Sequence, residues 1–241
     1  TVLRDGRLVD SRPIADYTLT TLIGDIMGRP TDNLSEFATT STSTGEVILE
    51  AEHLASQRGG DISFKLHKGE VLGIAGLLGA GRSRLARMLF GLEAVSAGNI
   101  RIRGAVRRIS APDAAKALGM ALVPEDRRRQ GLVLQHSIEA NIELPILRHL
   151  GRVFVDTAKS RSTAEALIRR LGIKTSSREA PANSLSGGNQ QKVVIGKWLA
   201  TTPEILILDE PTAGIDIGSK GEVLRLVREL AAEGKSIIFI S

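Results

Sequence analysis

Residues 76–83, Gly-Leu-Leu-Gly-Ala-Gly-Arg-Ser, combine the residue types that bind a phosphate group. They follow a short apolar run and precede a stretch with helical periodicity. Glycines let the backbone wrap closely around a phosphate, and the N–H groups at the start of a helix attract its negative charge. The alternative is a tight turn that binds no ligand. The predicted nucleotide-phosphate ligands are Gly76, Gly79, Ala80, Gly81, Arg82, Ser83 and Arg84.

Two side chains of this loop have distinct chemistry. The Ser83 hydroxyl is expected to bind Mg²⁺, as the hydroxyl does at this position of the pattern. Arg82 stands where the pattern has lysine. Lysine is a compact point charge, whereas arginine is a longer planar fork. We therefore expect nucleotide binding to persist and the geometry at the terminal phosphate to be less favourable.

A pair of acids follows the apolar run at residues 205–208. A continuous apolar run of this length is typical of a strand buried on both faces. Such a strand would deliver Asp209 and Glu210 to the edge of a sheet at which ligands bind. We expect Asp209 to hold Mg²⁺ through water, and Glu210 to be the catalytic residue that orients and polarises an attacking water.

A second predicted anion site begins at Ser186, with Gly187 and Gly188 opening a helix that runs to about Leu199. Because the chain already has a phosphate loop, a second site makes sense if it serves a partner's nucleotide. The alternative is an ordinary N-capped helix. Trp198, on the same helix, is expected in the core rather than at a ligand.

These motifs lie on alternating strand-like and helical stretches. The alternation predicts an α/β fold with a mostly parallel core sheet and, over about residues 135–200, an inserted helical subdomain. The expected strands are residues 47–49, 62–66, 71–75, 100–103, 120–123, 205–208 and 236–240, and the expected helices are 83–90, 112–118 and 220–232.

The first 45 residues differ from the rest. Residues 1–9 predict a hairpin that turns at Asp5-Gly6, and residues 16–27 have helical periodicity. Residues 31–45 are small and polar, which is typical of a flexible linker. The main domain is therefore expected to begin near Glu46.

The composition excludes some classes of function. The chain has no cysteine, so it has no disulfide or thiolate chemistry, and no apolar run reaches the roughly 18 residues of a membrane span. Its net charge is +5, with arginines gathered at residues 101–108 and 127–129. These are either solvated charges or a contact for an acidic loop, a membrane surface or nucleic acid. Because no aromatic residues interleave with them, we expect no nucleic-acid partner.

Four motifs together resemble those of the ATP-binding domains of ABC transporters, and they lie at residues 76–83, 185–192, 205–210 and 214–216. The resemblance extends from about residue 46 to the end of the sequence. The resemblance implies a P-loop NTPase fold of the ABC ATPase type, with an antiparallel β subdomain beside the parallel core. It also implies ATP and Mg²⁺ as cofactors, and two domains that clamp two ATP molecules head to tail. In that family the signature stretch contacts the partner's ATP and a following loop communicates across the interface. The matching residues are Ser186, Gly187, Gly188 and Gln190 for the signature and Asp216 for the loop.

More closely, the chain is similar to the second domain of tandem ATPases of bacterial monosaccharide importers, of the ribose, galactose, arabinose and xylose type. The likeness lies in Gly-Ala-Gly-Arg at 79–82, Pro-Glu-Asp-Arg at 124–127 and Gly-Asn-Gln-Gln-Lys at 188–192. It implies that residues 1–30 are the tail hairpin and linker helix of the first domain, and 31–45 a linker. Residues 46–241 would then be the second domain, cut before the family's switch histidine.

The same resemblance implies partners and a location. The partners would be the first nucleotide-binding domain of the same polypeptide or a second copy, membrane permease subunits and, indirectly, a periplasmic sugar-binding protein. The protein would act at the cytoplasmic face of the bacterial inner membrane as a peripheral subunit.

Three departures from the family pattern bear on activity. Arg82 replaces lysine, Glu125 stands where other members carry glutamine, and no aromatic residue for adenine stacking occurs between residues 47 and 63. Glu125 could bind Mg²⁺, but it adds negative charge near the γ-phosphate. We expect this site to bind ATP and hydrolyse it slowly. The alternatives are a fully active hydrolase site, or an ABC-type ATPase outside transport, although the long coiled-coil insertion of DNA-repair members is missing.

Overall fold

The computed structural model describes residues 1–4, 7–13, 45–77, 79–147 and 156–241, and singly 16, 18, 21 and 25. Its centre is a four-stranded sheet in the order β5-β10-β9-β8, with every neighbouring pair parallel. These strands are β5 (Val71–Ile74), β10 (Ser236–Ile240), β9 (Ile205–Asp209) and β8 (Met120–Val123). All residues of β8 and β9 are buried, which explains their continuous apolar sequences. The predicted parallel core is confirmed.

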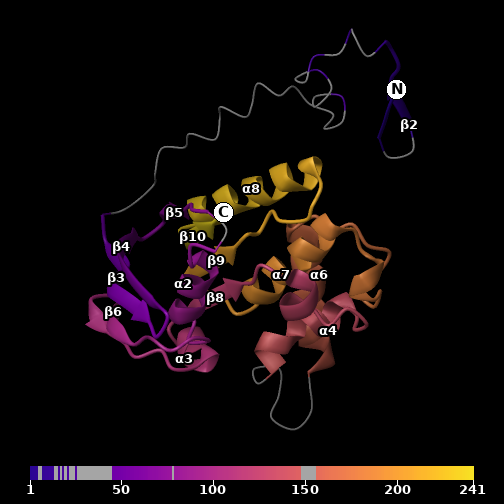
Figure 1. Cartoon of the computed structure of the whole chain (residues 1–241). Coiled ribbons are helices and arrows are strands. Elements are labelled where there is room, and N and C mark those ends of the chain that lie inside the picture. Colours follow the sequence, from indigo (N-terminus) through magenta and orange to yellow (C-terminus); the bar gives the residue numbers. More distant parts are fainter. Residues whose placement is uncertain are drawn as a thin grey trace.

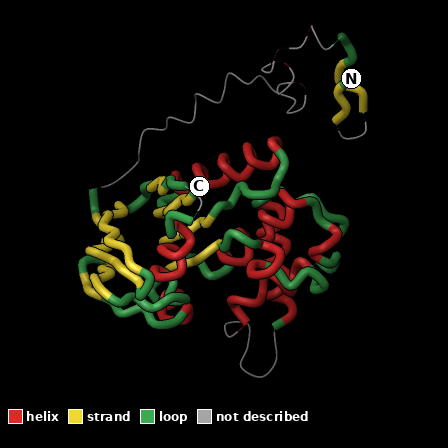
Figure 2. Tube along the Cα trace, viewed as in Figure 1, coloured by secondary structure: helices red, strands yellow, loops and turns green. Residues whose placement is uncertain are grey.

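Helices cover both faces of this sheet, as Figure 2 shows. Side chains alternate along β9: Leu206 and Leu208 join one buried cluster, and Ile205 and Ile207 join the other. The first cluster contains α7 (Gly187–Leu199) and α8 (Ile217–Ala232), and the second contains α2 (Arg82–Leu89). Fully burying one such side chain contributes about 1.5–3 kcal/mol. These two clusters hold the sheet rigid at the point where the site residues leave it.

Trp198 joins the two clusters. It packs against both of them and meets Phe90 edge to face, with 5.3 Å between ring centroids and an interplanar angle of 85°. Such aromatic pairs contribute about 0.5–1.5 kcal/mol beyond the area they bury. The expectation that Trp198 belongs to the core is confirmed.

An antiparallel sheet in the order β4-β3-β6-β7 lies beside the parallel one. It consists of β3 (Val47–Ser56), β4 (Gly59–His67), β6 (Ala97–Ile102) and β7 (Ala105–Val106). The prediction stopped β3 at residue 49, too early, because the pairing shifts between Ala51 and Leu54 and breaks the alternation. His53 sits at φ 49 there, and Gly98 packs so tightly on it that a Cβ would lie 2.3 Å from the His53 carbonyl oxygen.

The predicted helical subdomain is present in the described residues. It contains α4 (Ile138–Glu143), η4 (Leu144–Ile146), α6 (Thr157–Arg170), η5 (Ala182–Ser184) and α7. In Figure 1 its helices gather at one end of the parallel sheet, and the antiparallel sheet lies at the other. Each of its three α-helices begins with a side chain that accepts a hydrogen bond from a backbone N–H group. Ser137 caps α4, Asp156 caps α6 and Ser186 caps α7.

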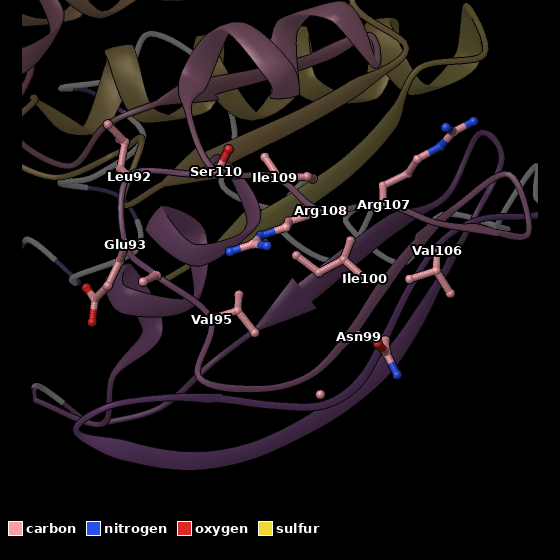
Figure 3. A pocket seen from close by; sticks show the side chains of 13 residues that line it. Leu92, Glu93, Val95, Asn99, Ile100, Val106, Arg107, Arg108, Ile109 and Ser110 are labelled. Carbon is pink, nitrogen blue, oxygen red and sulfur yellow. The ribbon is translucent and has the colours of Figure 1, made fainter.

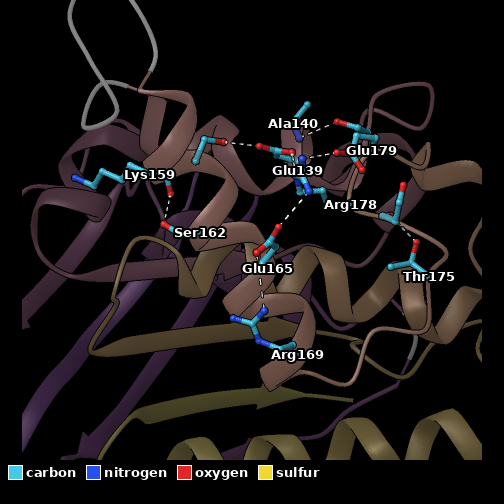
Figure 4. Close-up of polar contacts among 12 residues, drawn as sticks. Glu139, Ala140, Lys159, Ser162, Glu165, Arg169, Thr175, Arg178 and Glu179 are labelled. Atoms are coloured by element: carbon cyan, nitrogen blue, oxygen red, sulfur yellow. Dashed lines mark hydrogen bonds and ion pairs between the residues drawn. The ribbon is translucent and has the colours of Figure 1, made fainter.

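Arg178 ties this subdomain together, as Figure 4 shows. Its Nε donates to Glu139 Oε2 of α4 at 2.8 Å, and its Nη1 donates to Glu165 Oε1 of α6 at 3.1 Å. Ser160 of α6 also donates to Glu139, at 3.1 Å. Because the guanidinium is largely buried and satisfied by carboxylates from two helices, it fixes α4 against α6.

The remaining elements are short. β1 (Val2–Arg4) and β2 (Arg7–Asp10) form an antiparallel hairpin, as predicted, with Arg4 opposite Arg7. The Asp5-Gly6 turn lies outside the described residues, as do almost all of the predicted helix at 16–27 and of the linker at 31–45. α3 (Pro112–Ala117) precedes β8, and a π-helical turn, η3 (Arg127–Gly131), follows it. Within the described residues, no helix combines the length and apolarity needed to span a bilayer.

Candidate nucleotide-binding site

Three segments that carry predicted site residues leave the parallel sheet at the same edge. The glycine loop follows β5, Glu125 follows β8 after one residue, and Asp209 and Glu210 lie at the end of β9. All of these strands are parallel, so their carboxyl ends meet at one edge, where ligands bind in such sheets. The sheet thereby brings together Ser83 and Asp209, which are 126 positions apart in the sequence.

The glycine loop has the backbone conformation that a phosphate cradle needs. Gly79 has φ 85 and Gly81 has φ 91, in the left-handed region that glycine adopts without strain. Gly81 is the N-cap of α2, and no side chain caps the helix there. The N–H groups at the start of α2 are therefore left for an anion.

Ser83, Glu125 and Asp209 form one hydrogen-bonded cluster. The Ser83 hydroxyl lies 3.2 Å from Glu125 Oε2 and 3.1 Å from Asp209 Oδ1. Asp209 is 4% exposed. Burial raises the pKa of Asp209, and Glu125 and Glu210 raise it further, while the hydrogen bond from Ser83 opposes the shift. The cluster thus concentrates negative charge in a place where a cation would relieve it.

This donor set fits Mg²⁺. A hydroxyl and two carboxylates supply hard oxygen ligands, and Mg²⁺ usually takes only one or two carboxylates and completes its shell with water and phosphate oxygens. The described residues contain no group of three or more acids or histidines placed to hold a metal by themselves. A cation bound here would take its remaining ligands from water and phosphate oxygens.

Arg82 reaches from the loop to Glu210. Its Nη2 lies 3.0 Å from Glu210 Oε1, and the two side chains are 14% and 23% exposed. Glu210 has φ 46, which is unfavourable for a residue with a Cβ, and its N–H donates to the Ile240 carbonyl at 3.0 Å. The predicted phosphate ligand and the predicted catalytic acid thus neutralise each other in this state.

Arg84 is engaged elsewhere. Its Nε lies 3.5 Å from Glu93 Oε1, a residue that also accepts from Arg87 Nε at 3.3 Å. Arg84 nevertheless stays close to the loop, because a Cβ on Gly81 would lie 3.8 Å from its Nη1. Its role as a phosphate ligand stays a prediction.

The signature stretch has an exposed part and a buried part. Ser186 is exposed and caps α7, accepting from Asn189 N at 3.4 Å and from Asn189 Nδ2 at 3.0 Å. Gln190 is buried, and its amide donates to the carbonyls of Ala182 and Leu185. Gln190 therefore holds the preceding loop, whereas Ser186 and Gly187 lie nearer the surface.

Asp216 is exposed and caps α8. It accepts from Ser219 N at 2.9 Å and from Ser219 Oγ at 2.6 Å, and these bonds lower the pKa of Asp216. Ser219 in turn packs on Gly188, where a Cβ would lie 2.1 Å from Ser219 Oγ. The helix α8, which Asp216 caps, therefore packs directly on the signature helix α7.

Arg127 is a residue whose position the sequence did not reveal. Its Nη1 donates to the Ala213 carbonyl at 2.8 Å, and its Nη2 donates to the Gly214 carbonyl at 2.9 Å. The sequence showed only a basic run that follows the acids at 125–126. Arg127 and residues 213–214 are too far apart in the sequence for a local pattern to predict their contact.

One hollow is lined by site residues, and a second is not. One, of about 550 Å³, is lined by Glu125 and Asp209 together with Phe90, Pro124 and Trp198, among others. The other, of about 510 Å³, lies between residues 91–95, β6 and residues 106–110 and is shown in Figure 3. There the Arg108 side chain lies among the lining residues, whereas Arg107 extends away from them. This second hollow includes none of the predicted site residues.

Comparison with known proteins supports the assignment of this site to nucleotide binding. The profile of the ABC transporter family matches residues 60–213. The chain is 44% identical over 245 aligned positions to a putative ribose/galactose/methyl galactoside import ATP-binding protein of Burkholderia ambifaria, covering 100% of the chain and 47% of that protein. It is 43% identical to a ribose import ATP-binding protein of Rhodococcus jostii, covering 48% of it. The chain thus spans about half the length of these relatives.

The fold also matches a solved structure. A nucleotide-free ATP-binding cassette from an ABC transporter superposes with a TM-score of 0.69 at 21% identity, covering 81% of each chain. At this identity the likeness concerns the fold, and it agrees with the parallel core, the antiparallel sheet and the helical subdomain described above.

Proposed function

The chain belongs to the ABC transporter family, and from this premise we propose that residues 46–241 bind Mg-ATP and couple its hydrolysis to transport. The observation that carries the proposal is the cluster at the start of α2. There a hydroxyl from the glycine loop meets the carboxylates that follow β8 and β9, at 3.2 and 3.1 Å. A phosphate loop, a Mg²⁺ site and a catalytic carboxylate at one sheet edge are the parts that phosphoryl transfer to water needs.

Each residue has a definite task in this proposal. The backbone N–H groups around Gly79 and Gly81 hold the β- and γ-phosphates, and Arg82 adds positive charge. Ser83 and Asp209 would hold Mg²⁺, Asp209 through water, and the cation would neutralise charge on the phosphate oxygens. Once the ion pair between Glu210 and Arg82 has opened, Glu210 orients the attacking water and accepts its proton.

We further propose that the two sites of the complete protein divide the work. Ser186, Gly187 and Gly188 complete the site of a partner domain, while the site of this chain hydrolyses ATP slowly. The ion pair between Arg82 and Glu210 supports this division, because it must open before either residue can act. The rival is a fully active site. Comparable rates at both sites of the tandem protein, measured with one site inactivated at a time, would favour the rival.

The proposed cargo is a monosaccharide of the ribose or galactose type, since the relatives carry these sugars in their names. The proposed partners are the first nucleotide-binding domain of the same polypeptide or a second copy, the permease subunits and, indirectly, a periplasmic sugar-binding protein. The proposed location is the cytoplasmic face of the inner membrane. Salt-sensitive binding to nucleic acid by the intact protein, with no stimulation by a sugar permease, would favour an ATPase outside transport instead.

Calorimetric titration with Mg-ATP tests the nucleotide site. We expect micromolar-range binding that Ser83→Ala weakens about tenfold or more, because the cluster loses the hydroxyl that faces the cation. Ser162→Ala is a matched control, since this exposed serine on α6 donates only to the Lys159 carbonyl. Equal affinity of the wild type and Ser83→Ala would refute the assignment.

A further inference from the structure

Arg127 lies between two segments that the proposed function gives to the partner's nucleotide. Its two terminal nitrogens donate to the carbonyls of Ala213 and Gly214, in the loop before Asp216. On its other side it meets the signature, because a Cβ on Gly187 would lie 2.8 Å from Arg127 Nη2. The guanidinium thus fills the space between the interface loop and the start of α7.

The contact is built from backbone and packing rather than from an ion pair. Among the described residues, the terminal nitrogens of Arg127 donate to backbone carbonyls, and its Nε is buried without a partner. Burial, the largest cause, lowers the pKa of Arg127 and the neighbouring Arg128 adds to the effect, while Asp126 opposes it. The guanidinium is therefore held in place by the two carbonyls it donates to and by its packing against Gly187.

The segment that carries Arg127 is held firmly at both ends. Asp126 Oδ1 accepts from the backbone N–H groups of Arg128 and Arg129, each at 3.1 Å. At the far end of η3, Lys197 of α7 donates to the Gly131 carbonyl at 2.9 Å. A shift of this turn therefore moves α7, and the signature at its start, with it.

The same segment begins at the cation cluster. Glu125, two residues before Arg127, accepts from Ser83 at 3.2 Å. Building on the proposed function, we infer that Arg127 is a positioning residue that couples the Mg-ATP site of this domain to the signature surface offered to the partner's nucleotide. A change at Glu125 is carried through the capped turn to the Arg127 guanidinium, and from there to Gly187 and the loop at 213–214.

Turnover by the full-length tandem protein in its transporter complex tests this inference. All variants carry Glu210→Gln, so that only the partner's site is counted. We expect Arg127→Gln to lower kcat about tenfold with KM for ATP changed by less than about twofold, because the interface loop and the signature lose the contact that positions them for the chemical step at the partner's nucleotide. Arg127→Lys keeps the charge but cannot donate to both carbonyls at once. Its kcat should therefore lie between the values of the wild type and Arg127→Gln.

Arg128→Gln and Arg128→Lys are the matched controls. Arg128 is the adjacent, exposed arginine, and the same changes of charge and shape there should leave kcat unchanged. Unfolding temperature and binding of a fluorescent ATP analogue at this domain's own site separate positioning from folding, since a merely structural loss would lower both. If Arg127→Gln fails to fold, the kcat and KM of Arg127→Lys carry the test.

A double-mutant cycle tests the coupling itself. Ser83→Ala should lower partner-site kcat when Arg127 is present and have little further effect in the Arg127→Gln background. Additive effects, a wild-type kcat for Arg127→Gln, or an equal loss in Arg128→Gln would each overturn the inference. A wild-type tandem protein that does not hydrolyse ATP at all would refute the proposed function, and the inference would fall with it.

Discussion

Arg82→Lys tests how strongly the ion pair with the proposed catalytic acid slows turnover at this site. The two charged atoms lie 3.0 Å apart, and the side chains are 14% and 23% exposed. With an effective dielectric constant of about 20, attraction at this distance is about 5 kcal/mol before desolvation is counted. Desolvation offsets most of it, so we take the net stabilisation as about 1–2 kcal/mol, between exposed and buried pairs.

If the pair must open in every catalytic cycle, this free energy adds to the barrier. A barrier higher by about 1–2 kcal/mol slows turnover about 5- to 30-fold. Lysine offers a compact ammonium with a shorter reach, so it favours the phosphates over Glu210. We therefore expect Arg82→Lys to raise kcat of this site by about 5- to 30-fold.

The assay is phosphate release by the full-length tandem protein whose first domain has its catalytic carboxylate changed to an amide. Arg103→Lys is the control, because Arg103 forms another arginine–glutamate pair, 2.7 Å from Glu204, away from the site. A kcat for Arg82→Lys within about twofold of the wild type would refute the reasoning and favour a fully active arginine site.

Three further changes test how the site is built. Asp209→Asn should raise the free energy of unfolding at neutral pH, since the pKa of Asp209 is raised by folding; urea denaturation should show the gain fading as pH falls through the raised native pKa, and absent once the pH is below the ordinary aspartate pKa. Arg178→Ala should lower that free energy by about 1–3 kcal/mol in the same assay, because Glu139 and Glu165 lose their shared partner and keep only Ser160 and Arg169. Gly188→Ala should lower it by about 1–3 kcal/mol through overlap with Ser219, and Ser219→Gly should rescue it in part.

Much of the fold was predictable because its signals are local. The apolar runs of β8 and β9, the serine and glycines that open α7 and the glycines before α2 each act within a few residues. The predictions failed where a contact distant in sequence overrode the local pattern. β3 is the clear case, since the shift at His53 depends on the close approach of Gly98 from β6.

The site divides in the same way. Residue types and spacing within single segments identified the glycine loop, the acids after β9 and the signature serine, because a phosphate cradle needs particular backbone angles and a helix start. Only the tertiary structure paired Arg82 with Glu210, joined Ser83 to Glu125 and Asp209, and set Arg127 against residues 213–214. These contacts depend on the order of parallel strands and the packing of helices across the sheet, and no spacing along one segment encodes either.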